Sequence, residues 1–176
     1  MLETERLLMR PPKISDLGPL HEVWGDRDVM RWIGPGDSYS RDMGESERRL
    51  ERLIEHQETH GFSLWVVVER ETGTLVGDCG LVEFAFRGPE FELACCLHKG
   101  AWGQEYATEG GRAWLDLAFG ELGLPRVLAA VHPEHEAAQR VLDKLGMRRA
   151  RRTMVGETEV LVYAIERKEA EPATAS

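Results

Sequence analysis

The chain has 176 residues, of which 42% are hydrophobic and 30% charged, and its formal net charge at pH 7 is −9. This length favours one domain with a buried core, and the negative charge argues against a nucleic-acid partner, whose phosphates require a clustered positive surface. No apolar run approaches the roughly 20 residues of a membrane helix and no signal-peptide pattern is present, so we expect a cytoplasmic protein with no membrane partner.

The first 60 residues predict one strand and three helices. Residues 6–10 predict a short strand, which two prolines end. Apolar residues at helical spacing predict a helix over 17–24 and a second, short helix around 29–33, which the Gly-Pro-Gly sequence at 34–36 breaks. Residues 42–60 are highly charged with a few apolar residues on one face, which indicates an amphipathic surface helix.

The middle of the chain has the pattern of an antiparallel meander. Residues 62–69 are rich in β-branched side chains and predict a strand, followed by a hairpin turn at 71–74. Residues 75–86 predict a second strand, in which glycines indicate a bend or bulge, and residues 91–97 predict a third.

The last part of the chain alternates between helices and strands. We expect a helix over 105–122, a strand over 127–132, a helix over 134–145, and a final hairpin over 147–155 and 159–167. The whole order implies an α/β (α+β) fold with a single mixed, mostly antiparallel sheet flanked by helices.

The cysteines do not form a disulfide framework. Cys79, Cys95 and Cys96 are odd in number, two of them are adjacent, and no CxxC spacing typical of metal ligands occurs. Buried, reduced thiols are the simplest interpretation.

The stretch 92–109 is the most informative for chemistry. A strand ends near Leu97, a short loop containing Gly103 follows, and a helix begins near Tyr106. Such a turn directs unpaired backbone N–H groups and the positive end of the helix dipole at one point, which suits a pyrophosphate. The alternative is an ordinary strand-to-helix turn that binds nothing.

Five segments in order carry a resemblance to a known family. They are Thr-Glu-Arg-Leu-Leu-Met-Arg at 4–10, Thr-Gly with Leu-Val-Gly at 72–77, Trp-Gly-Gln-Glu-Tyr-Ala-Thr-Glu at 102–109, Val-His-Pro-Glu at 131–134, and Leu-Gly-Met at 145–147. The chain resembles the GCN5-related N-acetyltransferase (GNAT) superfamily, in the branch that includes the ribosomal-protein acetyltransferases.

This resemblance implies one N-acetyltransferase domain over 1–168, and the polar composition of 169–176 predicts a loose tail. The expected reaction is direct attack of a primary amine, on a protein N-terminus or a small molecule, on acetyl-CoA, without a metal. It also implies the residues that hold acetyl-CoA. Backbone groups of Cys95, Cys96 and Leu97 would hold the pantetheine arm, and N–H groups would hold the pyrophosphate from Gly103, Gln104, Glu105, Tyr106, Ala107 and Thr108.

The sequence departs from the family at several of these positions. Glu105 stands where the family has glycine or alanine, and a carboxylate there is tolerable only if it points away from the pyrophosphate. His135 replaces an asparagine that donates to pantetheine, which an imidazole N–H could also do, whereas Ala138 replaces a serine and cannot. His132 and His135 also raise a metal-site interpretation, but further ligands of the right kind are lacking.

The catalytic assignments are the least determined. Glu92 is the first candidate for the base that takes a proton from the amine, and Glu83 on the neighbouring strand is the second; for either, a plain surface carboxylate is the alternative. Leu142 stands where many relatives carry a tyrosine that protonates the departing thiolate, and Tyr163 or water could substitute.

The acceptor amine is expected on the side opposite the cofactor. Aromatic residues are candidates for its walls, with ordinary core packing as the favoured alternative. The candidates are Trp24, Trp32 and Phe84, with Trp65.

Three functions remain open at this point. The first is an active N-acetyltransferase, the second a non-catalytic acyl-CoA-binding module or sensor, suggested by the altered positions, and the third a structural or partner-binding domain. The last hairpin, with Val141 and Leu142, leaves a homodimer open.

Overall fold

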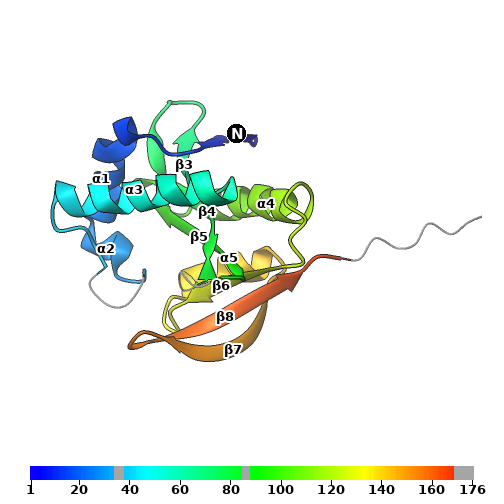
Figure 1. The fold of residues 1–176 in the computed structure, drawn as a ribbon. Coiled ribbons are helices and arrows are strands. Elements are labelled where there is room, and N and C mark those ends of the chain that lie inside the picture. The colour runs from blue at the N-terminus through cyan, green and yellow to red at the C-terminus, as the bar shows by residue number, and fades with distance from the viewer. Residues whose placement is uncertain (34–37, 85–87, 169–176) are drawn as a thin grey trace, which may run out of the picture.

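A computed structural model describes residues 1–33, 38–84 and 88–168 of the chain (Figure 1). The predicted helix break at 34–36, the last residues of the predicted strand 75–86 and the predicted loose tail at 169–176 lie outside the described residues. Within the described ranges, no helix is both long enough and apolar enough to cross a membrane.

The described strands form a single mixed sheet, as predicted. Its order is β1-β2-β3-β4-β5-β6-β8-β7, and every neighbouring pair is antiparallel except the parallel pair β5–β6. The strands are β1 (Leu2–Glu3), β2 (Leu7–Arg10), β3 (Leu64–Glu69), β4 (Leu75–Glu83), β5 (Phe91–Leu97), β6 (Arg126–Val131), β7 (Arg148–Val155) and β8 (Thr158–Glu166).

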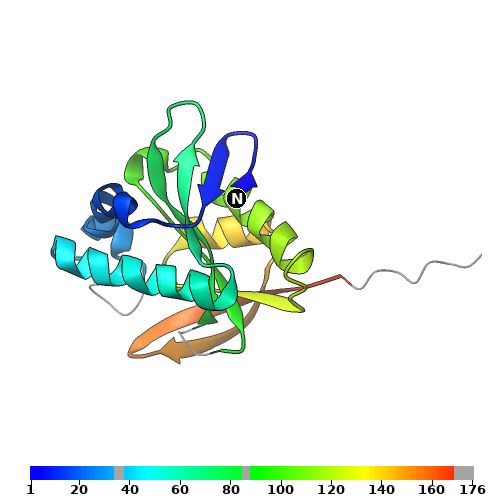
Figure 2. The same cartoon turned by 45° about the horizontal axis from the view of Figure 1, so that its top comes forward.

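Helices cover both faces of this sheet (Figures 1 and 2). One face packs against the first group of helices through a core that includes Leu20, Leu50 and Val66, and the other packs against the second group through a core that includes Trp114 and Leu93. The first group is α1 (Leu17–Trp24), α2 (Arg27–Met30) and α3 (Met43–His60), and the second is α4 (Tyr106–Phe119) and α5 (Glu136–Lys144).

Two details differ from the prediction. Helix α2 begins after Asp26, whose carboxylate accepts hydrogen bonds from the N–H groups of Asp28 and Val29, and it ends at Met30 after one turn. Trp32 therefore follows the helix. Strand β1 was not predicted, since its two residues are too short to show a period-2 pattern.

The predicted bulge in the second meander strand is confirmed. The register between β3 and β4 shifts at Val67 and Val68, opposite Gly77, whose φ is +150°. A Cβ atom at Gly77 would lie 2.1 Å from the Cys96 carbonyl oxygen, so only glycine allows β5 to approach this closely.

Strands β5 and β6 diverge, and this divergence positions the site. They share one register pair, Glu92 with Leu128, although β5 extends to Leu97 and β6 to Val131. The His98 N–H donates to the Val76 carbonyl, and the alternation of an antiparallel ladder therefore turns the amides of Cys95 and Leu97 away from β4, toward β6. The divergence leaves these amides at the edge of a wedge-shaped gap in the sheet.

Candidate functional site

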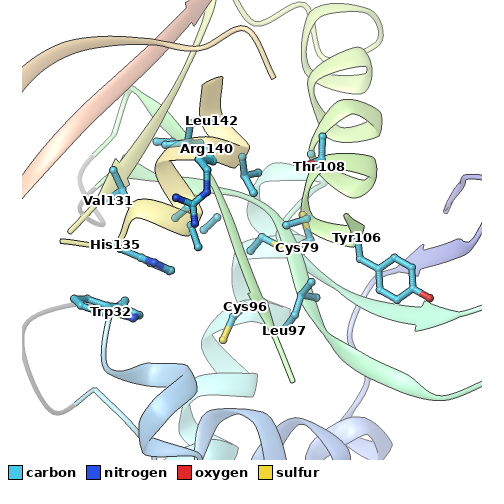
Figure 3. Close-up of a pocket in the computed structure, with 18 of the residues that line it drawn as sticks. Trp32, Cys79, Cys96, Leu97, Tyr106, Thr108, Val131, His135, Arg140 and Leu142 are labelled. Atoms are coloured by element: carbon cyan, nitrogen blue, oxygen red, sulfur yellow. The ribbon is translucent and has the colours of Figure 1, made fainter. Parts of the chain in front are cut away.

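A cavity of about 670 Å³ occupies the gap between β5 and β6 (Figure 3). Its walls come from both strands, from the start of α4, from α5 and from the residues around the end of α2. Nine of the ten residues predicted to bind the cofactor line it: Cys95, Cys96, Leu97, Gly103, Glu105, Tyr106, Ala107, Thr108 and His135, whereas Gln104 does not.

One end of the cavity is the start of α4. Gly103 has a φ of +73°, and a Cβ atom built there would have no heavy atom within 4 Å, so the loop is open on that side. Glu105 precedes the helix, and its side chain accepts no hydrogen bond from a backbone N–H group of the first turn. The N–H groups of that turn have no carbonyl partner inside the helix, and the helix dipole adds a partial positive charge. This end of the cavity can therefore bind an anion.

A network at the other side of α4 holds the helix start in place. The Glu109 carboxylate accepts hydrogen bonds from the Thr4 hydroxyl at 2.6 Å, from the Arg6 N–H at 2.9 Å and from Arg6 Nε at 2.7 Å. The Arg6 guanidinium lies 4.8 Å from the centre of the Tyr106 ring, whose hydroxyl donates to Glu69. The Tyr106 ring thus points away from the cavity (Figure 3), and Tyr106 contributes its backbone there.

The Glu109 network is expected to make the fold sensitive to acid. Burial alone would raise the pKa of Glu109, but hydrogen bonds from Thr4 and Arg6 outweigh it and hold the pKa below its usual value. The stabilisation is therefore present above the unfolded-state pKa of about 4.3 and is lost as pH falls through the lower folded-state pKa. Thermal unfolding should show Glu109→Gln less stable than wild type at pH 7, with a difference that shrinks below about pH 4. A pH-independent difference would contradict this assignment.

The strand edge provides polar groups along the middle of the cavity. The amides of Cys95 and Leu97 face the gap, and the Leu97 carbonyl accepts a hydrogen bond from the Trp102 indole at 2.8 Å. The backbone of Cys96 instead faces β4, and its sulfur lies 3.6 Å from that of Met30. Of the three residues predicted to hold pantetheine by their backbone, Cys95 and Leu97 direct their amides into the gap and Cys96 does not.

Trp32 and His135 meet at the edge of the cavity (Figure 3). Their rings are stacked, with centroids 5.1 Å apart and planes 17° apart, and His132 lies against the same indole at 5.0 Å. Burial first, then the charges of His132 and Arg31, lower the pKa of His135, so its imidazole is neutral at pH 7. A neutral ring retains one N–H donor for a ligand. Ala138 also lines the cavity and offers no donor.

The two predicted bases lie outside the cavity lining. Glu92 is half-buried, at the register pair that joins β5 to β6 and directly before the lining residue Leu93. Strand alternation puts the Glu92 side chain on the sheet face that α1–α3 cover. Glu83 lies further along β4, where its carboxylate is 3.6 Å from the His60 ring nitrogen. Of the two candidate bases, Glu92 therefore lies nearer to the cavity along the sheet.

The remaining aromatic candidates divide between cavity and core. Trp24 is fully buried and donates its indole N–H to the buried Asp78 carboxylate at 2.6 Å, so for Trp24 the core-packing alternative is correct. Trp65 packs edge-on against Trp114, with ring centres 4.8 Å apart, and Phe84 packs against a small separate cluster around Val162. Among these candidates, Trp32 alone lines the cavity.

Leu142, which stands where a tyrosine was expected, lies in the cavity wall. Leu142 is buried and lines the cavity, so an apolar side chain stands at that point. Tyr163, the suggested substitute, is buried on β8 and is not part of the lining. Its hydroxyl lies 3.5 Å from the Gln139 side chain.

Sequence reasoning missed two cations that line the cavity. Arg140 and Lys144 are one helical turn apart on α5, and Figure 3 shows Arg140 reaching toward the cavity. Their i,i+4 spacing could have indicated that they share a helix face, but not which element that face opposes.

Comparisons with known proteins identify the family and the fold. A family model described as an acetyltransferase (GNAT) domain matches residues 6–148. An uncharacterized N-acetyltransferase, p20, from Bacillus licheniformis is 26% identical over 84% of this chain and 82% of its own length. A GNAT-family acetyltransferase from Bacillus anthracis has a similar structure, with a TM-score of 0.80 and 25% identity over 95% of this chain and 98% of its own. The fold is also similar to that of spermidine N-acetyltransferase from Vibrio cholerae, solved with CoA and spermine, with a TM-score of 0.76 and 18% identity over 93% and 97% of the chains.

Proposed function

We propose that this chain, which belongs to the acetyltransferase (GNAT) family, transfers an acetyl group from acetyl-CoA to a primary amine by direct attack. The acceptor is an amine on a protein N-terminus or on a small molecule. Family membership makes the chain an acetyl-CoA-dependent acyltransferase; the acceptor class and the residue roles below are the proposal.

One observation carries the proposal. A single cavity joins an anion-binding helix start to an unpaired strand edge, so a ligand with a diphosphate and an amide-bearing arm can satisfy both at once. The N–H groups from Gly103 to Thr108 would hold the diphosphate. The Cys95 and Leu97 amides would pair with the arm, and the His135 N–H would donate to it. Acetyl-CoA supplies the activated thioester carbonyl.

The amine must lose a proton before it can attack, because an alkyl ammonium has a pKa of about 10. We assign this step to Glu92, directly or through a water molecule. One ammonium proton passes to the Glu92 carboxylate, and the free amine nitrogen then forms a bond to the carbonyl carbon. As the carbon–sulfur bond breaks and the amide forms, the nitrogen loses its second proton to solvent. The sulfur leaves as a thiolate, which at a thiol pKa of about 8.5 does not require an acid, so Leu142 is compatible with turnover.

A non-catalytic acyl-CoA sensor is the second candidate. It is favoured by the apolar side chains of Leu142 and Ala138 in the cavity lining, at positions where the family resemblance leads us to expect a tyrosine and a serine. Binding without turnover would identify it.

Acetyl-CoA should stabilise the protein against heat. A ligand at 100 times its Kd contributes about 2.7 kcal/mol to the unfolding free energy, or on the order of 5–10 °C in Tm for a chain of this size. Calorimetry or dye-based melting measures this shift, and release of free CoA thiol with a panel of N-terminal peptides, polyamines and aryl-alkyl amines measures turnover. No shift would reject the cofactor site, and a shift without thiol release from any amine would favour the sensor.

A further inference from the structure

The Glu105 carboxylate engages two donors at the anion-binding end of the cavity. Its Oε1 accepts a hydrogen bond from Lys144 Nζ at 2.6 Å, and its Oε2 accepts one from the Thr108 hydroxyl at 3.1 Å. Lys144 lies in the last turn of α5 and Thr108 in the first turn of α4, so the carboxylate connects the two helices across the cavity rim.

The backbone at Glu105 is also unusual. Its φ is +63°, and it is the one non-glycine residue with positive φ among the residues that the structure describes. An L-residue pays a steric cost in this region that glycine does not. This steric cost falls on the residue that immediately precedes the anion-binding helix turn. The side chain of the same residue forms the ion pair with Lys144.

A diphosphate bound at this helix start would compete for the same donors. Thr108 is buried, and its single hydroxyl proton can serve one acceptor at a time. The ion pair with Lys144 is about half exposed on both sides, 54% and 51%, and exposed pairs of this kind are weak and easily broken. A diphosphate carries more negative charge than one carboxylate, so the Lys144 ammonium would favour it.

We propose that Lys144 is a ligand for the diphosphate of acetyl-CoA and that Glu105 is an internal competitor, from which Lys144 and Thr108 transfer when the cofactor binds. This inference rests on the proposed function. It assigns roles that differ from the sequence-based expectation, in which Glu105 contributes only its backbone and Lys144 contributes nothing. Arg112 and Arg140, the other cations near this rim, remain unchanged in the test below.

The test is a double-mutant cycle on the full chain with two ligands, acetyl-CoA and S-acetylpantetheine, which lacks the phosphates. Titration calorimetry gives the Kd for wild type, Glu105→Gln, Lys144→Met and the double variant. Loss of one charge-assisted contact corresponds to about tenfold in Kd. We expect Glu105→Gln to tighten acetyl-CoA binding about fivefold or more. Lys144→Met should weaken it about tenfold in both the wild-type and the Glu105→Gln backgrounds.

Several outcomes would overturn the proposal. If Lys144→Met has no effect in the Glu105→Gln background, Lys144 only neutralises Glu105 and the proposal is overturned; the same holds if Glu105→Gln does not tighten binding. S-acetylpantetheine binding should not change, and a parallel change would show that the variants disturb the cavity as a whole, which also overturns it. Arg152→Met breaks an ion pair of similar exposure on the β7–β8 hairpin, outside the cavity lining, and controls for the loss of one positive charge. A wild-type chain that binds S-acetylpantetheine and acetyl-CoA equally overturns the inference together with the diphosphate site at the helix start, but leaves acetyl transfer possible. A chain that binds neither ligand overturns the proposed function itself.

Discussion

Replacement of Glu92 by glutamine is expected to lower kcat for acetyl transfer by about 10²-fold or more, with little change in the Kd for acetyl-CoA. Glutamine keeps the size and polarity of the side chain but cannot accept the proton that the ammonium group must lose. Because the Glu92 side chain does not line the cavity, the contacts to the cofactor should be unaffected. Single-turnover rates, together with calorimetric Kd values, separate the two effects.

The matched control for this variant is Glu83→Gln. Glu83 lies on the neighbouring strand and pairs with His60, away from the cavity, so its replacement should change kcat far less. Equal kcat values for wild type and Glu92→Gln would remove Glu92 as the base, and a larger effect at Glu83 would reverse the assignment.

The second large effect is expected at Gly103. Replacement by valine should weaken acetyl-CoA binding by about 100-fold, equivalent to the loss of two charge-assisted hydrogen bonds. A β-branched residue avoids a φ of +73°, so the loop must change its backbone and misdirect the N–H groups that face the anion. A Cβ atom at this position meets no protein atom within 4 Å, so the fold itself has room for the side chain.

Gly73 offers a closely matched control. It has a φ of +71° and equally open surroundings, but it lies in the β3–β4 hairpin and not in the cavity lining. Gly73→Val should lower the melting temperature about as much as Gly103→Val, because the backbone strain is the same, and should leave the Kd for acetyl-CoA unchanged. If the two variants bind acetyl-CoA equally well, the diphosphate does not contact the loop at Gly103.

The sequence predicted the elements of the fold well because their hydrophobic periods are local. The β-branched run of β3 and the amphipathic pattern of α3 require no knowledge of the partner segments. The divergence of β5 from β6 could not be predicted in this way. A strand's own period shows which side chains share a face, but not whether its edge finds a partner.

The site was predicted where a motif is contiguous and missed where it is assembled from distant segments. The loop from Gly103 to Thr108 is one continuous segment and could be recognised as a motif. By contrast, Glu105 and Lys144 are 39 positions apart, and Arg6 and Glu109 are 103 positions apart. In the sequence, nothing distinguishes Lys144 from an ordinary cation at a helix C-terminus. The tryptophans show the same limit, since Trp24 and Trp32 are the same residue type at neighbouring elements, and only tertiary packing separates core from cavity wall.

The single backbone junction at Glu92 and Leu128 has a mechanical consequence. Beyond this pair, no further register pair joins β5 to β6 in the described residues. The angle between the two halves of the sheet therefore depends on the packing of α4 against α5 and not on a hydrogen-bonded ladder. That packing is close: a Cβ atom at Gly111 would lie 2.8 Å from a methyl carbon of Leu145. Gly111 and Leu145 both line the cavity, so a larger side chain at Gly111 would press on Leu145 and change the spacing of the two helices from within the cavity wall.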